Sequence, residues 1–428
     1  MIFGKWLRRL TEAMLAIVLF GCAPPTEMSI AIATSTPTSP PTPVPTVTSN
    51  PTPTPVKIAS FEECLVGGWI QDTYPRQCIT KDGEVFTESL GEGVIYSKTY
   101  GSATGHETGR FIISTRDGGL LVTGGANSGC LVLKLDASGE KEWEASFEQE
   151  LRQEFQLYDT GFSCMFARQT PDDGYVIMGQ RYDLFSGLYQ RLFFIITLDA
   201  EGNWMSGQLI AEKAGKIPYL DQDGNLIRLT SMGTSGAVTE TIDGGYMIVN
   251  EYPERSDDSR THLTKTDKNG NYVWDINLCL DKNIQQAEAK KIVCSHNSYT
   301  YVWDVIQLKD GSFVVTGVSN GAWLLKTDLD GNVEWIRPYS GGAGCALVEL
   351  PDGGFLIAGF EHGDGFLIKT DSEGTMQWSK TFAGTGHYDM FLAMEQRPNS
   401  EITIVGRTQS SAGWDELWLV GIDSKLLK

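Results

Sequence analysis

The chain has 428 residues, a formal net charge of −20 and a hydrophobic content of 41%. This length leaves room for one large domain with appendages, and so acidic a surface repels nucleic acid and anionic lipid, so we expect neither as a partner. The 47 glycines, with 11 Trp, 15 Tyr and 18 Phe, suit many short strands joined by tight turns, as in barrels, sandwiches and propellers.

The first residues of the chain have the features of a bacterial export signal. A basic start precedes the apolar run 13–20, which is too short to span a bilayer, and Cys22 follows closely. The segment 19–22, Leu-Phe-Gly-Cys, resembles the lipobox of bacterial lipoproteins. The resemblance implies that residues 1–21 are removed and that Cys22 carries the lipid, on the extracytoplasmic side of a membrane in a bacterial cell envelope. The alternative is an ordinary secretory signal with an incidental Cys22.

Two appendages follow the anchor. Residues 22–57 are rich in Thr and Pro and cannot build a core, so we expect a semi-rigid extended stalk. Residues 58–90 contain the frame FEEC, YPRQC and DGxxF, which resembles a short Cys-pair module found beside bacterial lipoprotein stalks. The resemblance implies a disulfide between Cys64 and Cys78, which closes a loop that stabilises by about 3 kcal/mol in the chain-entropy model. Metal binding by the two thiols is the alternative.

Two kinds of hairpin alternate from residue 91 to residue 428. The first kind has an apolar strand, an Asp-Gly turn and a second apolar strand that ends in Gly, as in LVELPDGGFLIAG at 347–359. The last copy replaces the Asp-Gly turn with Pro398-Asn399. The six copies lie at 111–125, 166–180, 238–250, 305–317, 347–359 and 393–406.

The second kind of hairpin carries Asp, then Gly three residues later, then Trp four residues after the Gly. The Asp side chain can accept backbone N–H groups in the turn, Gly supplies a positive φ and Trp packs between layers. A weaker copy has Asp199 and Gly202, with Trp204 out of step. The four full copies are Asp136, Gly139 and Trp143; Asp267, Gly270 and Trp274; Asp328, Gly331 and Trp335; and Asp371, Gly374 and Trp378.

Together the two hairpins form a four-stranded antiparallel unit of about 45 residues, the size of a propeller blade. The last unit, which ends at 417–428, lacks its outer strand, whereas an orphan strand at 96–101 precedes the first unit and matches the outer strand at 378–382. We therefore predict an all-β fold, a six-bladed β-propeller over 91–428, in which the N-terminal strand closes the last blade and removes an open edge. We expect this propeller to be monomeric.

The repeats resemble a class of bacterial secreted β-propellers built from DGG hairpins that alternate with KTDxxGxxxW hairpins. They are also similar to the Trp-docked repeats of quinoprotein-type propellers, which would imply a quinone-dependent oxidoreductase. The interval from Asp to Gly is three residues here, however, whereas that family is expected to have four. The fold by itself supports binding, scaffolding or catalysis.

The insertions between strands point to a candidate binding face. Both hairpin turns stay short and lie on one face of a propeller, so the insertions at 144–162, 181–190, 207–235, 251–261 and 276–301 are expected on the opposite face. The aromatic and acidic residues of these insertions suit a glycan or a protein ligand. These residues are Tyr182, Phe185, Tyr189, Tyr219, Tyr252, Asp257, Asp258 and Tyr299. The alternative is that the aromatics only pack their own loops.

Five cysteines lie within the repeats. Cys279 and Cys294 bracket the longest insertion, and we expect them to form a disulfide. Cys164 and Cys345 lie near the start of a first strand, where small buried side chains are common. One of these two could pair with Cys130, so at least one thiol is expected to remain unpaired.

The search for catalytic motifs is mostly negative. No metalloprotease, serine-hydrolase, CxxC or phosphate-loop motif occurs, and the five His lack metal-ligand spacing, so we predict no metal and no cofactor. Only the acidic turns 221–224 and 328–331 leave a calcium site open. We predict a non-catalytic module that binds a protein or a glycan, and the alternative is a carbohydrate-active or quinoprotein-like enzyme. An enzyme should show a polar pocket near the axis with carboxylates or Arg converging, a binding module a broad aromatic surface, and a scaffold contacts at blade edges.

Overall fold

The computed structural model describes residues 69–71, 77–79, 85–87, 93–101, 105–127, 129–155, 161–182, 191–210, 216–230, 234–252, 260–278, 301–339, 341–382, 388–410 and 413–427. The chain divides into two compact units, Met1–Ser89 and Leu90–Lys428. In the first unit, β1 (Trp69–Gln71), β2 (Gln77–Ile79) and β3 (Val85–Thr87) form a three-stranded antiparallel sheet. The lipid-anchor site Cys22 and the stalk lie outside the described residues. Within those residues, every helix is too short or too polar to cross a bilayer.

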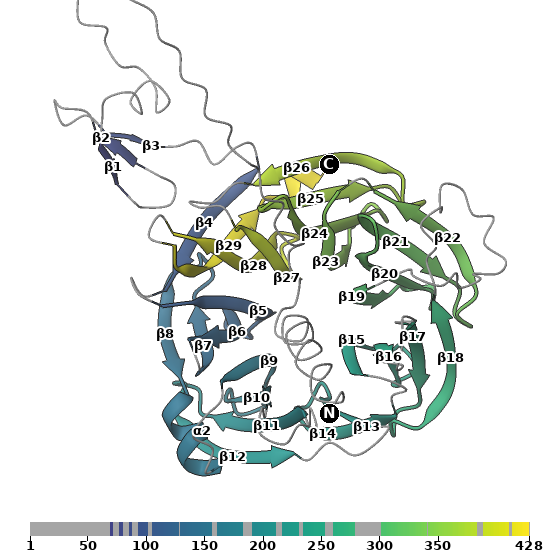
Figure 1. Ribbon diagram of the computed structural model, residues 1–428, viewed down its shortest axis with the longest axis horizontal. Coiled ribbons are helices and arrows are strands. Elements are labelled where there is room, and N and C mark those ends of the chain that lie inside the picture. The colour runs from purple at the N-terminus through teal and green to yellow at the C-terminus, as the bar shows by residue number, and fades with distance from the viewer. Residues whose placement is uncertain are drawn as a thin grey trace, which may run out of the picture. The chain divides into compact units, whose positions relative to one another are not determined.

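The second unit is a six-bladed β-propeller, as predicted (Figure 1). Blade 1 consists of β5 (Glu107–Ser114), β6 (Leu120–Ala126), β7 (Gly129–Leu135) and β8 (Lys141–Ser146). Blade 2 consists of β9 (Phe162–Gln169), β10 (Tyr175–Tyr182), β11 (Arg191–Leu198) and β12 (Trp204–Ile210). Blade 3 consists of β15 (Thr234–Glu240), β16 (Tyr246–Tyr252), β17 (Arg260–Thr266) and β18 (Tyr272–Leu278).

The remaining three blades repeat this antiparallel meander. Blade 4 consists of β19 (Tyr301–Gln307), β20 (Phe313–Val318), β21 (Ala322–Thr327) and β22 (Val333–Pro338). Blade 5 consists of β23 (Ala343–Glu349), β24 (Phe355–Glu361), β25 (Asp364–Thr370) and β26 (Met376–Phe382). Blade 6 consists of β27 (Met390–Gln396), β28 (Ile402–Gln409), β29 (Asp415–Ile422) and, from the other end of the propeller sequence, β4 (Val94–Tyr100). The first strand of each blade faces the axis and the fourth lies at the rim (Figure 1).

The orphan strand closes the ring. β4 pairs antiparallel with β29, with Tyr100 opposite Leu417 and Val94 opposite Ile422. The backbone N–H of Asp423 donates to the carbonyl oxygen of Gly93 at 2.8 Å. This hydrogen bond joins the two strands at the position where the other blades have a connecting turn. Both ends of the propeller sequence therefore share one sheet, and the predicted closure of the last blade is confirmed. A 3-10 helix, η1 (Ser424–Leu427), ends the described chain.

A tryptophan on the outer strand of one blade packs against the turn glycine of the next blade. The indole of Trp335 in blade 4 leaves no room for a side chain at Gly374 in blade 5, where an added Cβ would lie 2.7 Å from the ring. Trp143 meets Gly202 in the same way, and Trp274 meets Gly331. The glycine of the repeat is therefore needed for two reasons, its positive φ and its missing Cβ.

Where blade 6 packs against blade 1, a tyrosine occupies the position of the repeat tryptophan. Tyr96 pairs opposite Gly421, at the register position that Trp378 has opposite Lys369 in blade 5. A Cβ added at Gly139 of blade 1 would lie 3.4 Å from the Tyr96 ring. The closing strand thus supplies both the backbone ladder of blade 6 and its contact with blade 1.

In blades 1 and 5, a lysine of the third strand contacts the Asp of the blade's own Asp-Gly turn. The ammonium of Lys369 lies 2.8 Å from Asp352, and that of Lys134 lies 2.8 Å from Asp117. The two lysine side chains are almost completely buried, so the carboxylates satisfy charges that would otherwise be costly to bury. The lysine of the KTD pattern is therefore structural, because it joins the third strand to the first turn of the same blade.

The seam between blades 2 and 3 departs from this rule. In blade 2, Ser206 stands opposite Thr197, where regular blades have Trp opposite Lys. A hairpin of β13 (Lys216–Leu220) and β14 (Leu226–Thr230) lies between the two blades instead (Figure 1). The backbone oxygen of Arg228 lies 2.4 Å from where a Cβ on Gly270 of blade 3 would be. The hairpin therefore occupies the place of the missing indole.

This hairpin corrects the prediction for residues 207–235, which were expected to form a surface loop on the inserted face. Ile217 and Leu229 are buried against β16 of blade 3, and Leu220 is buried against β10 of blade 2. Asp221 accepts the backbone N–H groups of Asp223 and Asn225, so this acidic turn has the same structure as the repeat turns. Alternating apolar residues on either side of a D-x-x-G-N turn produce a strand pair rather than a loop.

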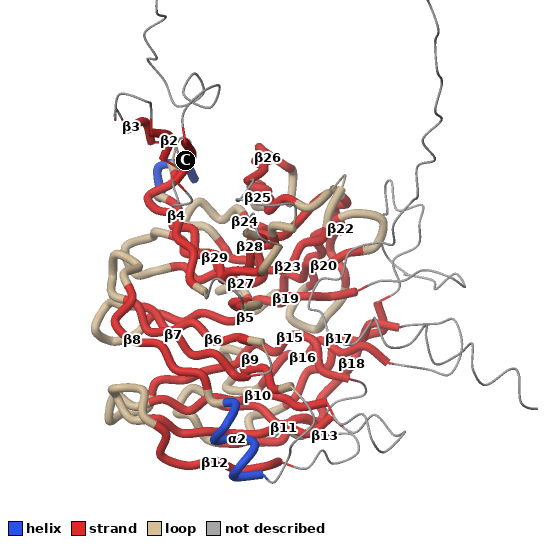
Figure 2. Tube along the Cα trace, turned by 60° about the vertical axis from the view of Figure 1, so that its left-hand side comes forward, coloured by secondary structure: helices blue, strands red, loops and turns tan. Residues whose placement is uncertain are grey.

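The insertion between blades 1 and 2 contains a helix. α2 (Glu148–Phe155) lies beside β12, as Figure 2 shows, and buries Leu151 in the core between the blades. Cys130 of β7 and Cys164 of β9 form a disulfide across the same seam, with their Cα atoms 5.0 Å apart. Blades 1 and 2 are therefore joined covalently as well as by packing.

Cys345 is disulfide-bonded too, and no cysteine among the described residues is free. The expectation that one thiol of Cys130, Cys164 and Cys345 stays unpaired is therefore wrong. Of the predicted pairs, Cys64 with Cys78 and Cys279 with Cys294, only the backbone of Cys78 in β2 is described, so both pairings stay predictions.

Candidate functional site

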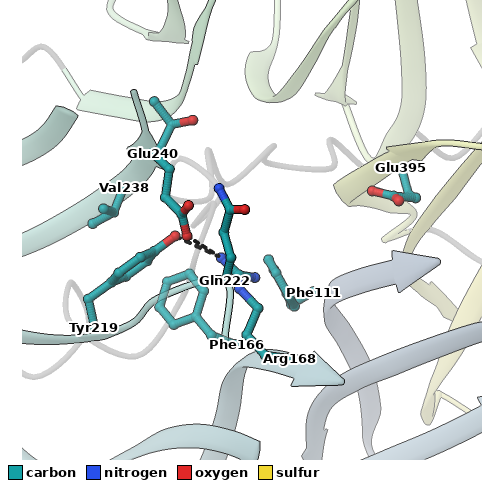
Figure 3. A pocket seen from close by; sticks show the side chains of 9 residues that line it. Phe111, Phe166, Arg168, Tyr219, Gln222, Val238, Glu240 and Glu395 are labelled. Carbon is teal, nitrogen blue, oxygen red and sulfur yellow. Dashed lines mark hydrogen bonds and ion pairs between the residues drawn. The ribbon is translucent and has the colours of Figure 1, made fainter. Parts of the chain in front are cut away.

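A pocket of about 680 Å³ lies at the axis beside the irregular seam. Its walls come from the first strands β5, β9, β15 and β27 and from the hairpin β13–β14 (Figure 3). Most of its residues lie within five positions of an Asp-Gly turn or its counterpart, so the pocket lies toward the turn-bearing end of the strands. The lining residues are Phe111, Phe166, Arg168, Tyr219, Gln222, Val238, Thr239, Glu240 and Glu395.

One wall of the pocket is aromatic. The rings of Phe111 and Phe166 meet edge to face with their centroids 5.4 Å apart, and Phe166 meets Tyr219 at 6.1 Å. Tyr219 continues the row to Tyr246 in blade 3 at 5.6 Å. Edge-to-face packing fixes these rings relative to one another, so the wall is formed before any ligand arrives.

Arg168 is the cation of the pocket. One terminal nitrogen of its guanidinium donates to the Tyr219 hydroxyl at 2.8 Å and lies 3.8 Å from Glu240 Oε1. The other donates to the carbonyl oxygen of Ala167 at 3.2 Å. These contacts hold the guanidinium in place against β9 and leave its charge compensated by Glu240 (Figure 3).

Glu395 faces this group from β27 on the other side of the pocket (Figure 3). Its Oε1 accepts the backbone N–H of Ser114 at 3.2 Å. Burial raises the pKa of the Glu395 carboxyl, while the hydrogen bond from Ser114 and the charge of Arg168 act in the opposite direction. The pocket therefore contains two carboxylates in different surroundings, one paired with Arg168 and one held by a backbone donor.

Of the predicted inserted-face residues, Tyr219 is the one whose side chain the structure describes. Tyr219 is buried, with 3% of its surface exposed, and lines the axial pocket, so its assignment to the inserted face was wrong. The reason is that its segment folds into the hairpin between the blades. Tyr182 and Tyr252 end β10 and β16, but their side chains lie outside the described residues. Outside the described residues altogether are Phe185, Tyr189, Asp257, Asp258 and Tyr299.

Sequence reasoning missed the charged residues of the pocket, although a signal was present. Arg168 and Glu395 occupy the position two residues before the first turn of their blades. At that position three other blades carry Ile113, Ile306 and Val348. A charge at a position that is apolar in three other blades could have identified these two residues. No group of three or more potential metal ligands occurs in the described part of the chain.

The chain was compared with known proteins. No protein-family model and no curated protein matches it. Among solved structures it is similar to Drosophila Plexin A in complex with Semaphorin 1b, with 8% identity over 78% of this chain and 88% of that one, at a TM-score of 0.49. It is also similar to a gluconolactonase from Xanthomonas campestris, with 12% identity over 78% and 91% of the two chains and a TM-score of 0.41.

The chain is also similar to a polysaccharide lyase, Uly1. The identity is 11% over 77% of this chain and 92% of that chain, and the TM-score is 0.40. Identities this low bear on the fold alone. A fold of this kind does not by itself define a function. The function of this chain has to be argued from its own pocket.

Proposed function

We propose that the chain is a lipoprotein of a bacterial cell envelope whose propeller binds a glycan without cleaving it, and that the axial pocket is the recognition site. The observation that carries this proposal is the combination of an aromatic wall with Arg168 and two carboxylates on rigid inner strands. Ligand sites are typically apolar concavities with a few fixed polar groups. Aromatic faces pack against the C–H faces of a sugar ring, and carboxylates accept its hydroxyl groups.

A glycan is favoured over a protein partner by the shape of the site. A pocket of about 680 Å³ accommodates one to three sugar rings, whereas a standard protein interface needs about 800 Å² from each partner. The inserted face, with its aromatic residues, stays a predicted second contact surface.

Calorimetric titration of the mature chain, residues 22–428 with Cys22→Ser, against a panel of oligosaccharides tests this function. We expect at least one oligosaccharide to bind, and Phe166→Ala to weaken it at least tenfold because the aromatic wall is lost. Tyr272→Phe changes an exposed tyrosine on the rim of blade 3 and serves as the control. Absence of binding to any oligosaccharide, or equal binding by Phe166→Ala, would contradict the proposal.

The lipid anchor is a separate part of the proposal. The lipobox-like segment ends at Cys22, and no other residue in it offers a thiol for acylation. Expression of the full chain with Cys22→Ser should move the protein from the membrane fraction to the soluble fraction. Continued membrane association of that variant would argue against the anchor.

A second candidate function is a carbohydrate-active enzyme, because carboxylates and an arginine converge at the axis as expected for one. The half-buried Glu395, whose pKa is raised, would act as the general acid and Glu240 as its partner carboxylate. Chromatography of the bound oligosaccharide after long incubation separates the two functions. Intact sugar supports binding alone, and shortened sugar that persists intact with Glu395→Gln supports the enzyme.

A further inference from the structure

The charges of the axial pocket do not balance. Its charged lining residues are Arg168, Glu240 and Glu395. The ion pair of Arg168 with Glu240 is neutral as a unit, at 3.8 Å between Nη2 and Oε1. The charge of Arg168 also acts on Glu395, but one cation faces two carboxylates, so the described lining has a net charge of −1 that a positively charged ligand would neutralise.

The pocket also needs hydrogen-bond donors more than it needs acceptors. Arg168 already donates to Tyr219 and to the backbone of Ala167. Glu240 Oε1 is buried and accepts no hydrogen bond from any described residue. Glu395 Oε1 accepts the backbone N–H of Ser114, and the Ser114 side chain also hydrogen-bonds this carboxyl. The unmet capacity is for donors, and a buried acceptor without a donor is costly unless a ligand or water supplies one.

We infer that the ligand is an amino sugar with a free ammonium group, which would lie against Glu395 while a hydroxyl group donates to Glu240 Oε1. This inference rests on the proposed function and narrows it to one class of glycan. The aromatic wall of Phe111, Phe166 and Tyr219 would cover the apolar face of the sugar ring.

The same arrangement excludes related glycans. A uronic acid would bring a third carboxylate into a pocket that already has an excess of negative charge. An N-acetylated sugar keeps its shape but loses the ammonium charge, and a neutral glucan offers only hydroxyl donors. The site should therefore distinguish sugars that differ solely in the substituent at carbon 2.

Calorimetric titration of the mature chain with Cys22→Ser tests the inference with three trisaccharides that share one backbone. These are the β-1,4-linked trimers of glucosamine, N-acetylglucosamine and glucose, titrated at about pH 6.5, where amino groups are protonated. We expect the glucosamine trimer to bind at least about tenfold more tightly than the other two, a difference that corresponds to about 1.4 kcal/mol.

Two variants test whether Glu395 causes the preference for the charged trimer. Glu395→Gln keeps an oxygen for the Ser114 N–H and should reduce the preference for the charged trimer to about twofold or less, with an unchanged far-ultraviolet circular dichroism spectrum. Glu373→Gln removes an exposed carboxylate in the second turn of blade 5 and should leave the preference intact. Equal losses in both variants would overturn the assignment to Glu395.

The outcomes separate this inference from the proposed function. If the neutral or acetylated trimer binds as tightly as the glucosamine trimer, the amino-sugar inference fails while the glycan-binding function stands. If trilysine binds and none of the sugars does, the ligand is a basic peptide, and both proposals fail as statements about glycans. Binding of none of the four compounds contradicts both.

Discussion

The seam between blades 4 and 5 and the seam between blades 2 and 3 solve the same packing problem differently. At the first, Trp335 covers Gly374, and the Tyr339 hydroxyl donates to the carbonyl oxygen of Gly374 at 2.7 Å. At the second, Ser206 occupies the tryptophan position and the hairpin β13–β14 fills the gap. The regular seam follows the repeat and carries no pocket residue, whereas the irregular seam supplies most residues of the axial pocket. The proposed binding site therefore lies where the repeat is interrupted.

The difference also concerns polar groups. Within blade 5, the buried ammonium of Lys369 is met by Asp352 of the same blade. At the irregular seam, Glu240 Oε1 stays without a hydrogen bond from the described residues, and the half-buried Glu395 is hydrogen-bonded by Ser114. A fold that leaves such groups unmet gives up stability there, which is common at binding sites. The comparison therefore predicts large losses of stability from substitutions at the regular seam and smaller effects, of either sign, at the irregular seam.

The largest effect is expected at the regular seam. Trp335→Ala should lower the free energy of unfolding by about 4 kcal/mol, because it empties a buried site between two blades. Trp204, the out-of-step tryptophan of blade 2, packs on Phe147 and on Gly207 of its own strand, so Trp204→Ala should cost less than half as much. Denaturant unfolding of both variants measures the difference. Equal losses would show that the repeat tryptophans hold no special role at the seams.

The turn glycines allow a matched test of docking. Gly331 and Gly118 both have φ of +84°, but a Cβ on Gly331 would lie 2.2 Å from Ile276, whereas one on Gly118 would meet nothing within 4 Å. Gly118→Ala should cost about 1 kcal/mol through backbone strain alone. Gly331→Ala should cost about 3 kcal/mol, because overpacking is added. Thermal unfolding of the two variants decides the matter, and identical melting temperatures would mean that only φ matters.

At the irregular seam the expected effect is smaller. Tyr219→Phe removes the acceptor for Arg168 and should lower the free energy of unfolding by about 1 kcal/mol. It should also weaken sugar binding, since the guanidinium loses one of its fixed contacts. The exposed hydroxyl of Tyr272, which donates to Asp275, provides the control, and Tyr272→Phe should leave binding unchanged. Full affinity in Tyr219→Phe would show that the hairpin does not position Arg168.

The smallest effect concerns pH and has the opposite sign. Burial raises the pKa of Glu395 in the folded protein above its usual value of 4.5. The carboxyl is therefore more favourable to folding when protonated, and its contribution is lost as pH rises through the raised pKa. Glu395→Gln should melt at a higher temperature than the unmodified chain at pH 8, and the gap should close below pH 4.5. A variant less stable at pH 8 would show that Glu395 stabilises the fold.

Much of the fold could be predicted because the repeat pattern is regular. Asp, Gly and Trp recur at fixed spacing, and the orphan strand at 96–101 matches an outer strand elsewhere, so six blades and their closure followed from the sequence. The hairpin was missed because residues 207–235 were treated as one insertion, although the turn 221–225 has the D-x-x-G-N pattern of the repeat turns.

The axial site could not be predicted to the same degree. Arg168, Tyr219, Glu240 and Glu395 are far apart in the sequence, and they meet only because first strands from different blades converge on one axis. The order of the blades around the ring follows from the sequence, but which side chains remain uncovered depends on how the hairpin fills the gap. The Cys130–Cys164 bridge was left open for the same reason, since it joins strands of two different blades.

Hydrogen exchange with mass spectrometry, on the mature chain with and without the glucosamine trimer, tests most directly whether the irregular seam is the binding site. Binding at the axial pocket predicts slower exchange in peptides that cover β9, β13, β15 and β27, with no change in β19 to β26. Slower exchange confined to the regular seams of blades 4 and 5, with β9 and β13 unchanged, would contradict it.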